Sequence, residues 1–362
     1  PISIITNFFF KINFLVASII FIIGLILFVW EIKFKKNFVK ILVSILFLLI
    51  LIPYFFLSSH HDDFYYYHLP YLNILQNSKI IFGLVNLNTV LAYPQNLWFN
   101  VFSLFRLPII DFNGIQALNG IFTLFFIIFC YENFLNSKLI KVKIINLTFI
   151  VFIFVLFSRL KDHGAEIIPQ LLILVCCYYI FELLFDKSIN KNEYITKIIL
   201  IFTCAILLRL SSIILLPFIF YIFLINFNNL LNFFKNLKFV LIVIILVTLV
   251  LIKNFINSGC IVYPLSSTCF KQDQVSWSID KDIPKINENV ILSYTRGWMI
   301  YAKENTNGSG KFVFNPTNKI LTHKEYLDNG PKFWLKYWFK DADIIRITNM
   351  FLVGLFILIC LF

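Results

Sequence analysis

Charged residues are scarce in this chain. They make up 14% of its 362 residues, whereas hydrophobic residues make up 60%, and the mean hydropathy is +0.85. A soluble domain usually carries about 25% charged and about 45–50% apolar residues. The shortage of charge therefore excludes an ordinary soluble protein and predicts an all-α polytopic membrane protein.

Several other signals are missing. The seven cysteines form no C-x-x-C pair and no metal-finger spacing, which argues against a zinc-finger protein. No cleavable signal peptide is visible, because the apolar run after Lys11 is too long and lacks a cleavage site. The net charge of +12 comes without a basic patch on a soluble fold, so we expect no nucleic-acid partner. Lysine-rich cytoplasmic loops beside an anionic lipid bilayer explain that charge better.

Long apolar runs are abundant. A membrane-spanning helix needs about 20 predominantly apolar residues, and about nine transmembrane helices are predicted. The predicted spans are Ile12–Trp30, Phe38–Leu57, Gly114–Tyr131, Ile144–Phe157, Ile167–Leu184, Tyr194–Leu208, Ser212–Phe227, Phe239–Ile252 and Ile344–Phe362. Because the chain begins at Pro1 without Met and ends inside an apolar run, we expect it to be a fragment of a longer protein.

These runs divide the chain into three predicted parts. Residues 1–258 form a transmembrane core with an extracytoplasmic loop at 58–111, residues 259–342 form an extracytoplasmic segment, and residues 343–362 form a further transmembrane helix. Two proline-bounded segments of the loop, Pro70–Gln76 and Pro94–Pro108, are predicted to be interfacial helices.

The charges predict an orientation. The loops assigned to the inside hold twelve lysines, whereas the short outside loops hold five basic residues. Positive charge marks the cytoplasmic side, so we expect a multi-pass protein of the plasma (inner) membrane with the loop at 58–111 outside. Around Arg209-Leu210-Ser211-Ser212 two interpretations stay open: a tight turn between two helices, or one long kinked helix.

Asp62 and Asp63 follow the apolar run Ile41–Phe56 and are the leading candidate site residues. Ionisable groups at a membrane boundary are costly and are functional candidates by default. Either carboxylate can act as a general base toward an acceptor hydroxyl. The pair can also hold a divalent cation, Mg or Mn, that bridges a phosphate. The alternative is a solvated pair that marks the end of a helix.

Aromatic and imidazole side chains surround this pair. His61, Tyr67 and His68 are candidate substrate-binding residues, because helical spacing groups Asp63 with Tyr67 and His61 with His68. Hydrogen bonding to a substrate fits them better than a three-histidine metal site. The tyrosines can equally be interfacial anchors.

A second ionisable cluster contains Lys161, Asp162 and His163. Its basic residues can clamp a phosphate and Asp162 can assist a metal, or the cluster is a solvated connector. Arg209 ends an apolar run and either snorkels to the interface or pairs with an anionic ligand.

Two features of the outer segment are notable. Cys260 and Cys269 lie where a disulfide can persist, and whether they are bridged stays open. Residues 332–340, Lys-Phe-Trp-Leu-Lys-Tyr-Trp-Phe-Lys, alternate basic and aromatic residues, which predicts an interfacial anchor.

The arrangement of a carboxylate loop after an early span, many spans and a late outer segment resembles the GT-C superfamily of integral-membrane glycosyltransferases. Asp63-Phe64-Tyr65-Tyr66-Tyr67-His68-Leu69-Pro70 is similar to the Asp-x-x-x-Tyr-His-Leu-Pro loop of an uncharacterised bacterial branch. Weaker similarities occur at Gly83–Asn88, Lys161-Asp162, Arg209-Leu210-Ser211 and Ser258–Pro264.

The resemblance implies transfer of a sugar from a polyprenyl-phosphate donor to an envelope glycan, lipid or protein acceptor, on the extracytoplasmic face. The essential aspartate would be Asp63, with Asp62 as the alternative, and Lys161 and Arg209 would hold the lipid phosphate. Two rival functions stay open: a polysaccharide polymerase or ligase of lipid-linked oligosaccharides, and a membrane transporter.

Overall fold

A computed structural model of the chain describes residues 2–34, 42, 45–50, 64–93, 97, 115–155, 167–186, 189–280, 282–305 and 320–340. These residues form helices and no strand, apart from an isolated β-bridge between Cys260 and Cys269. The helical class predicted from the composition is therefore confirmed for this part of the chain. Two compact units divide the molecule: unit 1, Pro1–Asn257, and unit 2, Ser258–Phe362.

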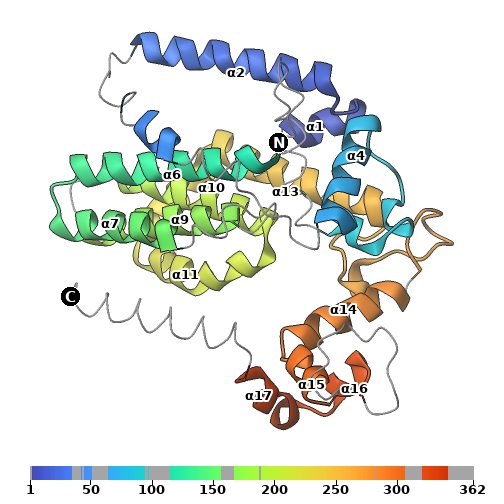
Figure 1. Ribbon diagram of the computed structural model, residues 1–362. Coiled ribbons are helices and arrows are strands. Elements are labelled where there is room, and N and C mark those ends of the chain that lie inside the picture. Colours follow the sequence, from blue (N-terminus) through green and yellow to red (C-terminus); the bar gives the residue numbers. More distant parts are fainter. Residues whose placement is uncertain are drawn as a thin grey trace. The chain divides into compact units, whose positions relative to one another are not determined.

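Unit 1 is an assembly of helices in which α6, α7, α9 and α10 lie side by side (Figure 1). Its helices are α1 (Ile2–Phe9), α2 (Phe14–Phe34), α4 (Leu69–Asn77), α6 (Ile115–Asn136), α7 (Ile140–Val155), α9 (Ile167–Phe185), α10 (Lys191–Leu208), α11 (Leu216–Ile225), α12 (Phe227–Lys235) and α13 (Leu237–Ser258). Short helical turns connect them: η1 (Phe64–His68), η2 (Leu84–Asn86), η3 (Thr89–Ala92) and η5 (Leu210–Leu215).

Two helices among the described residues, α9 and α13, are long and apolar enough to cross a membrane. A third span is formed if residues Leu210–Ile225 and Phe227–Lys235, bent by 95° at Asn226, are counted together. These helices indicate a membrane protein. They also show that the predicted number of about nine spans is too high for this part of the chain.

The excess arose because an apolar run does not show how long its helix is or which charges the helix includes. The described part of α7, Ile140–Val155, has 16 residues, about 24 Å at 1.5 Å per residue, which by itself is shorter than the roughly 30 Å hydrocarbon core. Helix α10 has 18 residues but includes Lys191, Glu193 and Lys197. Most of Phe38–Leu57 and all of Ile344–Phe362 lie outside the described residues.

The break at Arg209 is a turn between helices, and the alternative of one long kinked helix is wrong. Helix α10 ends at Leu208, Arg209 is extended with φ −155° and ψ 117°, and η5 begins at Leu210. The hydroxyl of buried Ser212 donates to the Ala205 carbonyl at 3.1 Å. The Ala205 carbonyl also accepts the Arg209 amide at 2.9 Å, so the hydroxyl adds a second bond that holds the turn against the end of α10.

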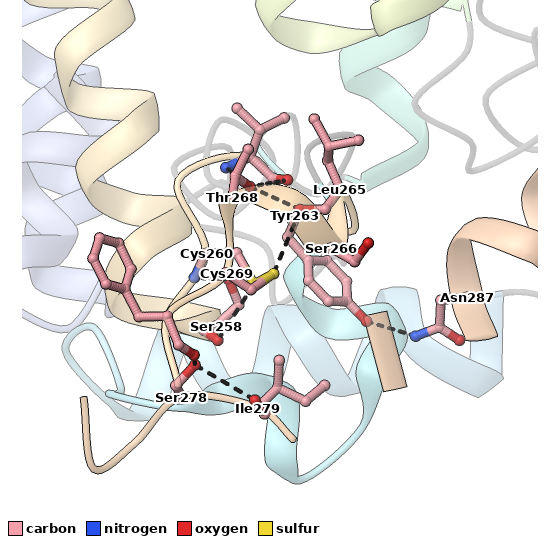
Figure 2. The surroundings of a disulfide bond; sticks show 12 residues. Ser258, Cys260, Tyr263, Leu265, Ser266, Thr268, Cys269, Ser278, Ile279 and Asn287 are labelled. Carbon is pink, nitrogen blue, oxygen red and sulfur yellow. Dashed lines mark hydrogen bonds between the residues drawn. A yellow bond between two sulfur atoms is a disulfide. The ribbon is translucent and has the colours of Figure 1, made fainter. Parts of the chain in front are cut away.

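Unit 2 begins with a disulfide-linked loop. Cys260 and Cys269 are bridged, which settles the pairing that the sequence left open, and the Ile261 amide donates to the Thr268 carbonyl at 3.1 Å. The fully buried Tyr263 accepts a hydrogen bond of 2.7 Å from the Asn287 side chain (Figure 2). The loop, which includes η6 (Ser266–Thr268), is thereby tied to α14 (Asp282–Tyr294).

The remaining helices of unit 2 pack around buried aromatic rings. They are α15 (Trp298–Asn305), α16 (His323–Asp328) and α17 (Pro331–Trp338). Tyr301, Tyr326 and Tyr337 are each at most 5% exposed and form the centre of this core. The Ser293 hydroxyl of α14 lies 2.7 Å from His323 Nδ1, and the Trp298 ring centroid lies 4.2 Å from that of His323.

Glycine is required at one turn of the disulfide-linked loop. Gly259 and Gly330 both have positive φ, +73° and +78°, but a Cβ on Gly259 would overlap Ser278, whereas a Cβ on Gly330 would meet open space. We expect Gly330→Ala to cost about 1–3 kcal/mol through its backbone conformation alone, because φ 78° with ψ 177° is adopted almost only by glycine. Gly259→Ala should cost about 1–3 kcal/mol more through overpacking. Tryptic cleavage of unit 2 in the full-length chain during a temperature ramp measures the difference, and equal midpoints would contradict it.

The stability of unit 2 should fall at mildly acidic pH. Burial lowers the pKa of His323 below its usual value, so the folded unit favours the neutral imidazole. The contribution is then complete above about pH 6.5, the unfolded value, and is lost as the pH falls toward the lowered folded value. His323→Gln should flatten the dependence of the same cleavage midpoint on pH between about 7 and 5; an unchanged slope would assign it to other groups.

Candidate functional site

The residues after the paired aspartates form one helical element. The wide turn η1 begins at Phe64, directly after Asp63, and continues into α4, with Pro70 in the first turn. A missing N–H is tolerated there, which explains why the helix starts at this point. Single π-helical turns occur frequently at functional sites. The helix predicted at Pro70–Gln76 is therefore present, extended by one residue at each end.

One face of this element is buried in the protein, not in the membrane interface as predicted. Tyr71 and Leu72 are 1% exposed and Leu75 is 3% exposed, and these residues belong to the main hydrophobic core of unit 1. Of the predicted site residues, Tyr67 and His68 lie on the same buried side, 7% and 5% exposed, with ring centroids 4.2 Å apart. Burial raises the pKa of Tyr71 above its ordinary value, so its hydroxyl stays neutral.

Backbone hydrogen bonds hold this element from two directions. The Ile12 amide, just before α2, donates to the Leu75 carbonyl at 2.8 Å. Beyond α4, the Gly83 amide donates to the Ile256 carbonyl of α13 at 2.9 Å. Since these bonds join distant parts of the chain, they fix α4 against the end of a candidate membrane span.

Lys253 lies one turn before Ile256 in α13 and is only 5% exposed. Its Nζ lies 5.4 Å from the centroid of the Tyr71 ring, over the face of the ring. Such a contact stabilises an ammonium group that has lost its water, by about 2 kcal/mol or more when desolvated. Lys253 was not predicted as a site residue because the predicted span Phe239–Ile252 ends just before it, although an ionisable residue at a membrane boundary is itself a signal.

Arg209 lies at the same end of the bundle as Lys253. It is half-buried and follows Leu208, which belongs to one hydrophobic cluster with Val250 of α13. Val250 is one turn before Lys253. Two basic side chains, Lys253 on α13 and Arg209 at the end of α10, therefore lie near the core that contains the buried face of α4. Together they can attract a phosphate or another anion.

For the second predicted cluster, the structure describes the helices on either side of it. Helix α7 ends at Val155 and α9 begins at Ile167, and Ile153 and Ile168 belong to the same hydrophobic core as Tyr67 and Tyr71. Six predicted site residues lie outside the described residues: Asp62, Asp63 and His61 of the first cluster, and Lys161, Asp162 and His163 of the second. The same is true of the segment Pro94–Pro108, except Leu97.

A second buried ionisable residue, Glu182, lies in α9 and is 7% exposed. The hydroxyls of Tyr178 and Tyr194 hydrogen-bond to its carboxylate, while Oε2 has no partner among the described residues. Glu182 is three residues from the end of α9 at Phe185. A transporter would need ionisable groups near the middle of the bilayer, so this position does not favour that function.

Comparisons with known proteins give one match. Searches of curated proteins and of solved structures found no match. A family match covers residues 2–362, which is nearly the whole chain. The protein therefore belongs to the family described as Domain of unknown function (DUF8201).

Proposed function

We propose that the protein is a GT-C-like glycosyltransferase that moves a sugar from a polyprenyl-phosphate donor to an envelope glycan, lipid or protein acceptor. The reaction would take place on the extracytoplasmic face of the plasma membrane. One observation supports this most strongly: the element η1–α4 starts directly after Asp63 and buries its inner face against Lys253, at the end of a candidate span. The chain that follows the paired aspartates is thus packed against a basic side chain at the end of a candidate span.

The phosphate of the donor would be held by cations. During transfer the bond between the anomeric carbon and the phosphate oxygen breaks, and its electron pair stays on the phosphate. Lys253 and Arg209 would stabilise the charge that develops there, with Lys161 as a further candidate. Cations in a site that excludes water are worth more than in bulk solvent.

The acceptor would be activated by a carboxylate. Its hydroxyl oxygen forms the new glycosidic bond to the anomeric carbon, and its proton passes to Asp63, or to Asp62 as the alternative. His61, Tyr67 and His68 would hydrogen-bond the sugar, and Asp162 and His163 would assist from the second cluster. The packing of Ile153 and Ile168 into the core that contains Tyr67 supports this pairing of the two clusters.

A divalent cation at Asp62 and Asp63 stays a prediction. Among the described residues there is no group of three or more His, Cys, Asp or Glu side chains that could hold a metal. The described polar groups near α4 that suit a phosphate are cationic, Lys253 and Arg209. No step of the proposed reaction is therefore assigned to a metal.

Replacement of Asp63 by Asn should abolish transfer. A positioned general base contributes about 10²–10⁴-fold to the rate, so Asp63→Asn should lose about that factor while the protein still inserts into membranes. Proteoliposomes that contain the full-length chain can be assayed with a panel of radiolabelled polyprenyl-phosphate sugars and extracted envelope acceptors. Full activity in Asp63→Asn, with loss in the matched control Asp62→Asn, would move the role to Asp62. Full activity in both variants would remove the carboxylate mechanism, and a larger loss in Arg209→Ala than in Asp63→Asn would favour the rival polymerase or ligase.

Replacement of Lys253 by Met should weaken phosphate binding without unfolding the protein. Met keeps most of the side-chain volume, and the lost charge-assisted contact is worth about 1.5–3 kcal/mol, or about tenfold to 100-fold in affinity. Undecaprenyl phosphate is the probe and undecaprenol, which lacks the phosphate, is the control ligand; both are titrated into nanodiscs containing the chain. Lys253→Arg should retain binding. Equal affinity of Lys253→Met and wild type would exclude a phosphate contact.

A further inference from the structure

Helix α17 has two chemically different faces. Lys332, Lys336 and Lys340, the last just beyond the helix end, follow one another at intervals of four residues and are all exposed. Residues at this spacing lie on one side of a helix. The large apolar side chain of Phe339 lies beside them and is 64% exposed. We refer to these three lysines as the lysine stripe.

The aromatic residues of α17 are used by unit 2 itself. The ring centroid of Tyr337 lies 5.3 Å from that of Tyr301 and 5.5 Å from that of Phe333. The guanidinium of Arg296 lies 5.1 Å from the Trp334 ring. The sequence predicted an anchor that inserts these rings into the interface. Because the rings pack inward instead, the surface that α17 presents is mainly cationic.

We propose that the lysine stripe docks on the headgroups of anionic phospholipids in the bilayer that the chain itself spans. Charge complementarity supports this occupant, since each Lys near an anionic membrane surface contributes about 1 kcal/mol. Connectivity supports it too. Ile344, where the last predicted span begins, is only four residues after Lys340, a distance of at most about 14 Å, so that span would keep the stripe near the headgroups.

The three lysines do not contribute equally. Lys340 Nζ lies 2.7 Å from the Glu304 carboxylate, so part of its charge is already neutralised. Lys336 Nζ lies 4.8 Å from the Tyr337 ring centroid, at the edge of the aromatic core. Docking therefore depends mainly on Lys332 and Lys336. It is electrostatic and at the level of the headgroups, and it does not depend on the proposed glycosyltransferase activity.

Amine footprinting of the full-length chain tests the proposal. The protein is placed in nanodiscs of phosphatidylcholine alone or with 30% phosphatidylglycerol, about the content that makes a surface clearly anionic, and its lysines are acetylated and quantified by mass spectrometry. We expect labelling of Lys332 and Lys336 to slow about fivefold with phosphatidylglycerol, which corresponds to about 1 kcal/mol each, and to recover at about 1 M salt. Three other exposed lysines of unit 2, Lys271, Lys285 and Lys324, should not change.

Matched triple variants keep the proposal falsifiable. Lys332→Gln/Lys336→Gln/Lys340→Gln should abolish the effect of phosphatidylglycerol on hydrogen exchange of residues 331–340. Lys271→Gln/Lys285→Gln/Lys324→Gln, with the same change in charge, should retain it. Equal labelling in both nanodiscs would overturn the proposal. Protection that high salt does not reverse would also overturn it, because it would mean that protein and not lipid headgroups covers the lysine stripe. Protection by an added acidic polysaccharide but not by phosphatidylglycerol would assign the stripe to another partner and also overturn it.

Discussion

The contact between Lys253 and Tyr71 is the interaction on which the candidate site depends. An ammonium group in an apolar helix is costly, because it leaves water without an equivalent solvent. The cation–π contact with the Tyr71 ring, whose centroid lies 5.4 Å from Nζ, offsets part of that cost. The contact also links α13 to α4 beside the backbone bond from Gly83 to Ile256. The buried Lys253 and the helix that follows the aspartates are therefore held together by one packing contact.

The two units differ in how they bury their large apolar and aromatic side chains. Unit 1 leaves large apolar side chains on the outside of α11 and α13, such as Phe218, Phe220 and Ile244, each at least 52% exposed. A lipid environment makes that exposure favourable. Unit 2 instead gathers its aromatic rings inward and closes its first loop with the Cys260–Cys269 disulfide. That design suits a segment in an oxidising aqueous compartment, which is consistent with the predicted extracytoplasmic placement.

The sequence predicted features that depend on local chemistry. Pro70 predicted where α4 begins, and the polar interruption at Arg209 predicted a break between helices. It failed where the outcome depends on distant parts of the chain. Tyr71 was expected in the membrane interface because nothing local shows that α13 covers it, and its partner Lys253 was missed because the predicted span Phe239–Ile252 ends just before it. The number of spans was too high because helix ends and included charges, as in α10, decide whether an apolar run can cross a bilayer.

The two proposed ligands assign lysine two different physical roles, and burial separates them. Lys253 is 5% exposed, so a phosphate that reaches it meets a charge that salt screens weakly and that is held in one place. The lysine stripe is exposed, so its attraction to an anionic surface is diffuse and falls steeply with ionic strength. Raising the salt concentration should therefore release α17 from headgroups while leaving a phosphate at Lys253 largely bound. The difference in salt dependence distinguishes recognition of one lipid phosphate from general adhesion to a charged membrane, although both ligands carry the same chemical group.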